Sequence, residues 1–281
     1  MEFFTAADGL RLAYDDTGSG PVLLCLPGLT RNMDDFEPVV DHFAHRARVI
    51  RMDFRGRGAS GYDPDPSHYN VVQEGADVID LLDHLGLEKA AILGTSRGGL
   101  VAMALALTHL HRLSGVCFND IGPVVDPEGL RYIMGYLGLP PTDPDFDTAL
   151  RDLPKRMGAR FVDVQTETWA NYIRRVWHVA EDGRLSLRYD AKLRQAVLDQ
   201  MAAAEGVEMP EIWPLFQALA DLPLALIRGA NSDLLSSETA AQMRSLRPDM
   251  IFADVPNRGH VPFLDEPESR AVISKFLDLL T

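Results

Sequence analysis

The sequence predicts an α/β protein with a mainly parallel sheet that is flanked by helices and interrupted by a helical insertion. Two observations indicate this class. Apolar runs typical of strands alternate with segments of helical spacing over residues 1–123 and again over 221–281. Between these parts, residues 124–220 contain helical segments and no convincing buried strand. We therefore expect a core domain formed by 1–123 and 221–281, with 124–220 as a helical cap.

The first part of the core contains six predicted strands. The run PVLLCLPG is continuously apolar, which is typical of a strand buried on both faces of a sheet. Asp8-Gly9 is a hairpin signal between the first two strands. The six strands are expected at residues 2–9, 10–18, 21–28, 47–56, 89–96 and 113–122. Helices are expected at 33–44, at 71–86 with Gly86 as the stop signal, and at 97–112.

The cap follows the sixth strand, and the alternation of strand and helix then resumes. The helical segments of the cap are predicted at 127–138, 146–162, 166–180 and 189–206. After them we expect a strand at 223–230, a helix at 236–246, a strand at 250–256 and a closing helix at 267–280. The return of the strand pattern assigns residues 221–281 to the same core domain as 1–123.

Composition narrows the possible functions. The 281 residues are 46% hydrophobic and 24% charged, which suits a globular protein with a sizeable core. A net charge of −14 disfavours binding to nucleic acid or to anionic membranes. Cys25 and Cys117 lie in apolar strand segments without metal-site spacing, so we expect buried, reduced thiols. We expect no signal peptide or membrane-spanning segment and therefore a cytoplasmic location.

The stretch GTSRG at 94–98 matches Gly-x-Ser-x-Gly and stands between a predicted strand and a predicted helix. This is the context of a nucleophile elbow, a strained turn that lifts a serine side chain clear of the sheet. Two glycines can also make an ordinary tight turn. The position between strand and helix favours the catalytic interpretation, with Ser96 as the nucleophile.

A serine hydroxyl needs a base to accept its proton, and after this kind of elbow the acid and then the histidine follow in the chain. Of eight histidines, only His260 lies in a loop after the last predicted strand. We predict Asp233, after the strand at 223–230, as the acid that orients His260. Asp120, one strand earlier, is the alternative; it would otherwise cap a turn or line the pocket.

Acyl transfer also needs donors for the oxyanion. We predict the backbone N–H groups of Leu29 and Arg97, with Gly28 allowing a close approach of the backbone to the substrate. The Arg97 side chain is expected to form a salt bridge within the protein rather than bind a substrate carboxylate, and Arg55 and Arg57 are expected to be structural. The candidate pocket residues are Gly28, Asp120, Tyr132, Tyr136, Trp169 and Trp177. Aromatic residues at helical spacing can equally pack a cap onto a core.

Five motifs together carry a family resemblance: LPGLTRN, DFRGRGAS, GTSRGG, RGANSD and NRGHVPFLDEP. They resemble the α/β-hydrolase fold superfamily, and within it the capped cytoplasmic esterases, enol-lactonases and carbon–carbon bond hydrolases. The resemblance implies an eight-stranded sheet with an antiparallel second strand, a helical cap over the active site, and neither a cofactor nor a metal.

These observations predict a serine hydrolase that cleaves a carboxylic ester or lactone of small to medium size through an acyl-enzyme. A carbon–carbon bond hydrolase or an acyltransferase using the same residues is the alternative, and a ligand-binding protein without catalysis is a further one. The expected partner is a small-molecule ester or lactone, not nucleic acid or a membrane. We expect a monomer or a homodimer.

Overall fold

The computed structural model describes residues 1–203 and 212–280. Residues 204–211 of the predicted cap therefore lie outside the described residues, and they include the end of the helix predicted at 189–206.

Eight strands form one sheet in the order β1-β2-β4-β3-β5-β6-β9-β10. They are β1 (Glu2–Thr5), β2 (Arg11–Gly18), β3 (Val22–Leu26), β4 (Arg48–Met52), β5 (Ala90–Thr95), β6 (Leu113–Asn119), β9 (Leu224–Gly229) and β10 (Ile251–Val255). The second strand, β2, is antiparallel to both of its neighbours, whereas all pairs from β4 to β10 are parallel. The predicted α/β-hydrolase sheet is confirmed.

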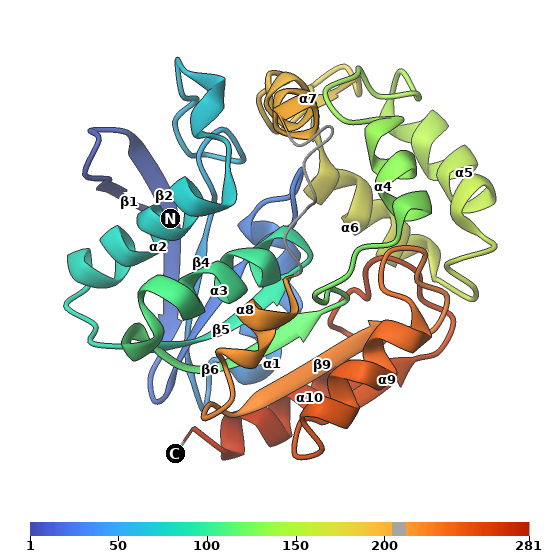
Figure 1. Ribbon diagram of the computed structural model, residues 1–281. Helices are drawn as coiled ribbons and strands as arrows, with labels where there is room; N and C mark the ends of the chain where they lie inside the picture. Colours follow the sequence, from blue (N-terminus) through green and yellow to red (C-terminus); the bar gives the residue numbers. More distant parts are fainter. Residues whose placement is uncertain (204–211, 281) are drawn as a thin grey trace.

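Helices cover both faces of this sheet (Figure 1). One face packs against α2 (Val71–His84), α3 (Arg97–Thr108), α8 (Trp213–Gln217) and α9 (Ser237–Leu246). The other packs against α1 (Glu37–Phe43) and α10 (Pro267–Asp278). Short 3-10 helices occur at η1 (Met33–Phe36), η2 (Pro66–His68) and η3 (Leu110–Arg112).

Strand β3 shows why the apolar run at its centre is continuous. Leu24 and Leu26 belong to the apolar cluster on the α2–α3 face, whereas Leu23 and Cys25 belong to the cluster on the α1–α10 face. Successive side chains of a strand point to opposite faces, so a strand covered on both sides needs apolar residues at every position.

Between β6 and α8, the described residues of the inserted segment form four helices and a hairpin. They are α4 (Pro127–Met134), α5 (Phe146–Met157), α6 (Thr166–Val176), β7 (Trp177–Val179), β8 (Leu185–Leu187) and α7 (Leu193–Ala203). The helix predicted at 166–180 is wrong beyond Val176, because the next three residues pair antiparallel with β8. Tryptophan and valine at these positions favour an extended chain. Figure 1 shows α4–α7 gathered at one end of the sheet, away from α10.

Different parts of the segment predicted as the cap pack against different neighbours. Helices α5 and α6 share an apolar cluster of their own. Phe216 of α8, within the predicted cap, instead packs against Phe118 of β6, with ring centroids 6.2 Å apart. The domain boundaries at 123/124 and 220/221 stay predictions.

Cys25 and Cys117 are both buried and form no disulfide, and burial raises the pKa of each thiol. Within residues 1–203 and 212–280, none of the helices combines the length and the apolar character needed to cross a bilayer. The cytoplasmic location and the monomeric or dimeric state stay predictions.

Candidate active site

Ser96 occupies the turn between β5 and α3, with φ 50° and ψ −112°. A non-glycine residue rarely adopts a positive φ, and such strain persists only where the surroundings enforce it. Here the close packing of strand and helix depends on two glycines. A Cβ on Gly98 would lie 2.2 Å from the Leu26 carbonyl oxygen, and one on Gly94 would lie 2.6 Å from the Gly98 carbonyl carbon. The glycines thus allow helix and strand to approach closely enough to hold the serine in this turn.

His260 links Ser96 to a carboxylate. It lies in the loop after β10, as predicted, and its Nε2 is 3.0 Å from the Ser96 Oγ. Its Nδ1 is 2.8 Å from Oδ2 of Asp120. The predicted contact between His260 and Asp233 is therefore wrong, and the alternative, Asp120, occupies that place.

Asp120 follows β6 directly and is completely buried. Its Oδ1 accepts the Gly229 N–H at 2.8 Å. Its Oδ2 accepts the Ser232 hydroxyl at 2.6 Å in addition to contacting His260. Both oxygens are thus held by donors from the end of β9 and the loop that follows it, and a carboxylate fixed in this way selects the tautomer of the histidine that carries its proton on Nδ1.

Asp233 lies in that same loop after β9 but points elsewhere. Its carboxylate is paired with Arg160, whose guanidinium stacks 4.0 Å from the centre of the Tyr132 ring. The preceding residue, Ser232, is turned inward to Asp120, so Asp233 faces the inserted helices. Because β6 and β9 are adjacent parallel strands, both aspartates reach the same edge of the sheet; only the loop conformation separates them.

The predicted oxyanion donors lie beside Ser96. Arg97 is the first residue of α3, where a backbone N–H has no acceptor within the helix. A Cβ on Gly28 would be 3.8 Å from the Ser96 Cβ, so the loop after β3 passes next to the serine. Leu29 follows in that loop and lines the neighbouring cavity.

The Arg97 side chain points away from the cavity, as predicted. Its Nε donates to Oε2 of Glu74 at 2.6 Å, and Nη1 of Arg57 lies 2.9 Å from Oε1 of the same carboxylate. Glu74 and Arg57 are fully buried. Burial by itself would raise the pKa of Glu74, but Arg97 and Arg57 outweigh it and lower that pKa. The arginines are structural: Arg55 likewise pairs with the buried Asp77.

We expect Glu74→Gln to lower the free energy of unfolding by about 3–5 kcal/mol, because it leaves two buried guanidinium groups without their shared carboxylate. Urea denaturation followed by circular dichroism measures this. Glu88→Gln, which removes a charge from an exposed residue, should change the stability by less than about 0.5 kcal/mol. Equal stability of the two variants would contradict a supporting role for this cluster.

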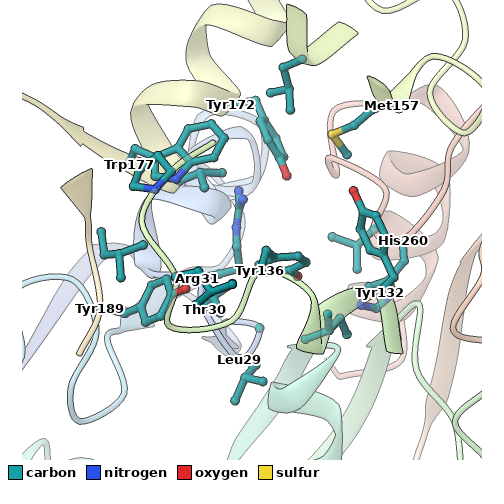
Figure 2. Close-up of a pocket in the computed structure, with 18 of the residues that line it drawn as sticks. Leu29, Thr30, Arg31, Tyr132, Tyr136, Met157, Tyr172, Trp177, Tyr189 and His260 are labelled. Carbon is teal, nitrogen blue, oxygen red and sulfur yellow. The ribbon is translucent and has the colours of Figure 1, made fainter. Parts of the chain in front are cut away.

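A cavity of about 200 Å³ lies above Ser96 between the sheet and the inserted helices. The predicted residues Tyr132, Tyr136 and Trp177 line it (Figure 2), and so does Gly28. Two predicted residues do not. Asp120 is buried beneath His260, and Trp169 is buried in the insertion, where its ring packs edge-on against Phe161.

Sequence reasoning missed several lining residues, among them Thr30, Arg31, Met157 and Tyr189. Arg31 belongs to the motif LPGLTRN, three residues after Gly28, so its sequence position already placed it near the oxyanion loop. Met157 and Tyr189 come from the insertion, and periodicity alone does not distinguish a lining side chain from one that packs the interior.

Asp8, Asp63 and His68 are the side chains that converge closely enough to share a metal ion, among the residues that the structure describes. Nη1 of Arg55 already donates to Asp8 at 2.9 Å and to Asp63 at 2.5 Å. A guanidinium between the two carboxylates neutralises them and gives each a donor. This cluster is therefore an ion-pair network of the structure.

Comparison with known proteins agrees with this architecture. The sequence matches the model of the alpha/beta hydrolase family over residues 23–271. It is 33% identical over 276 residues to the 3-hydroxybutyrate-oligomer hydrolase of Cupriavidus necator, covering 95% of this chain and 92% of that protein. The 2-(acetamidomethylene)succinate hydrolase of Mesorhizobium japonicum is 23% identical over 270 residues, covering 96% of this chain and 92% of that protein.

Among solved structures, an alpha/beta hydrolase from Novosphingobium aromaticivorans is 40% identical, with a TM-score of 0.90 and coverage of 99% of this chain and 97% of that one. The family model spans most of the sequence, and the order of the strands in the sheet fits the same architecture. This chain belongs to the alpha/beta hydrolase family.

Proposed function

We propose that the protein is a serine hydrolase that cleaves carboxylic esters through an acyl-enzyme on Ser96. The observation that carries this proposal is the row of hydrogen bonds from Ser96 to His260 (3.0 Å) and from His260 to Asp120 (2.8 Å). A serine becomes a useful nucleophile when a histidine accepts its proton and a carboxylate orients that histidine. The mostly apolar cavity above Ser96 suits a small-molecule substrate.

In the proposed mechanism, Nε2 of His260 accepts the Ser96 proton as Oγ attacks the ester carbonyl. Asp120 keeps Nδ1–H in place and stabilises the imidazolium that forms. The Leu29 and Arg97 amides donate to the oxyanion. His260 then gives the proton to the leaving alcohol. A water molecule, deprotonated by His260, attacks the acyl carbonyl; as the bond to Oγ breaks, His260 returns this proton to Ser96 and the carboxylic acid leaves.

The relative from Cupriavidus necator supports the choice of an ester. It is named as a hydrolase of 3-hydroxybutyrate oligomers, and hydroxy-acid oligomers are joined by ester bonds. We extend this bond type to the present chain as part of the proposal. Lactones contain the same reacting group and could use the same steps.

A trapping experiment tests the proposal. Diethyl 4-nitrophenyl phosphate should inactivate the protein with release of one equivalent of 4-nitrophenol, and peptide mass spectrometry should find the diethylphosphoryl group on Ser96. Hydrolysis of 4-nitrophenyl acetate and butyrate should stop in parallel. Ser96→Ala should take no label, whereas Ser237→Ala, at an exposed serine, should be labelled like the wild type. Labelling elsewhere, or ester hydrolysis that survives full labelling of Ser96, would contradict the proposal.

A further inference from the structure

The cavity above Ser96 has an unusual charge for this protein. The chain carries 41 acidic and 27 basic residues. Yet its lining contains Arg31 and Arg156, and none of the lining residues that the structure describes is an aspartate or glutamate. Each arginine is paired with an aspartate that does not line the cavity, Asp35 or Asp143, so the cavity wall offers an anionic ligand guanidinium groups without a carboxylate of its own.

Arg31 lies at the reacting end of this cavity. The Cβ position of Gly28 is 3.2 Å from the Arg31 Cγ and 3.8 Å from the Ser96 Cβ, so one glycine separates the base of the arginine from the serine. Figure 2 shows the Arg31 side chain extending from the core loop toward Tyr172 of α6. Its guanidinium carbon is 4.7 Å from the centre of the Tyr172 ring.

Asp35 accepts hydrogen bonds from two of the three nitrogen atoms of the Arg31 guanidinium. Nε and Nη2 of Arg31 donate to the two oxygens of Asp35 at 2.7 and 2.5 Å. This pair does not involve Nη1, which carries two further N–H donors. Burial opposes the charged form, but Asp35 outweighs it and raises the pKa of Arg31, so the group stays cationic. Asp35 thus positions Arg31 and maintains its charge.

The neighbouring tyrosines add neutral donors. Burial raises the pKa of Tyr172, and a tyrosine hydroxyl such as that of Tyr136 ordinarily carries its proton at neutral pH. Both residues line the cavity with Arg31. A guanidinium with tyrosine hydroxyls beside it offers several N–H and O–H donors, which is the arrangement that a carboxylate accepts from.

Arg156 is a weaker candidate for this role. Its Nη1 and Nη2 are both engaged by the two oxygens of Asp143, and its side chain is 40% exposed, compared with 16% for Arg31. An exposed ion pair contributes less to binding than one that is partly desolvated.

We propose that Arg31 forms a carboxylate-binding subsite beside Ser96, so that the preferred substrates are esters that carry a free carboxylate. This inference rests on the proposed ester hydrolysis at Ser96 and adds the substrate class. Arg31 binds the anion and takes no part in bond making or breaking.

Two matched pairs of esters test the subsite. Mono-4-nitrophenyl glutarate and 4-nitrophenyl hexanoate differ by a carboxylate on the acyl part. The compounds 4-butyryloxybenzoate and methyl 4-butyryloxybenzoate differ by a carboxylate on the alcohol part. The quantity compared is the preference for the anionic ester, which is its kcat/KM divided by the kcat/KM of the neutral ester. For at least one pair, Arg31→Met should lower this preference by roughly tenfold to a hundredfold, mainly by raising the KM of the anionic ester.

Arg151→Met is the matched control, because it removes the same charge from an exposed position on α5. It should keep the wild-type ratio. An unchanged ratio in Arg31→Met for both pairs, or a loss in Arg156→Met alone, would overturn the assignment. If Arg31→Met does not fold, inhibition of the wild type answers the question: glutarate should inhibit hydrolysis of 4-nitrophenyl hexanoate competitively and at least tenfold more strongly than glutaramide. Equal inhibition would count against the subsite.

The two proposals fail differently. If wild type and Ser96→Ala hydrolyse the neutral esters at the same rate, the proposed function fails. If neutral esters are hydrolysed in a Ser96-dependent way but the anionic preference does not depend on Arg31, only the subsite fails.

Discussion

Replacing Ser96 with alanine is expected to lower kcat for 4-nitrophenyl butyrate by roughly 10⁵- to 10⁶-fold, and His260→Ala should have an effect of similar size. The reason is that nucleophile and base act as one unit: without Nε2 the hydroxyl keeps its proton, and without Oγ the base has no nucleophile to activate. The double variant should therefore be little worse than either single variant. Steady-state kinetics on purified protein measures all three.

Controls of the same chemistry are available at the surface. Ser237→Ala and His42→Ala change exposed residues and should keep wild-type kcat. Thermal unfolding of each variant shows whether the fold is retained. Residual activity of Ser96→Ala above about one per cent of wild type, with the double variant as background, would exclude Ser96 as the nucleophile.

The second large effect is expected for Asp120→Asn, which should lower kcat by roughly 10³- to 10⁴-fold. The amide that replaces the carboxylate can turn an N–H₂ group toward Nδ1 of His260, and the imidazole then carries its proton on Nε2, facing Ser96. In that tautomer it cannot accept the serine proton. The loss should appear both in kcat and in the rate at which diethyl 4-nitrophenyl phosphate labels Ser96, because both reactions need the same base.

Asp233→Asn is the matched comparison, with the same chemical change on the adjacent strand's loop. It removes the partner of Arg160 and should change kcat by no more than a few fold. The opposite ranking, with Asp233→Asn the more damaging of the two, would assign the acid to Asp233 and contradict the geometry around His260.

Much of the fold follows from local patterns in the sequence. The run at 21–28 is apolar at every position because β3 is covered on both faces. Gly94 and Gly98 beside Ser96 are required because a Cβ would lie 2.6 and 2.2 Å, respectively, from backbone atoms. Chain order, together with the predicted helix after Ser96 and the predicted cap, separated His260 from the seven other histidines. The hairpin β7–β8 was missed because three-residue strands give too short a pattern to distinguish from a helix end.

Sequence thus determined the sheet, the elbow and the position of His260, since each depends on residues close together in the chain or on their order. Tertiary structure alone decided which of Asp120 and Asp233 contacts His260. Both follow adjacent parallel strands, and the difference lies in a positive φ at Asp120, the inward turn of Ser232 and the capture of Asp233 by Arg160 from the insertion. It also decided that Arg31, rather than Trp169, faces the cavity, because whether a side chain lines a space depends on what packs against it from distant segments.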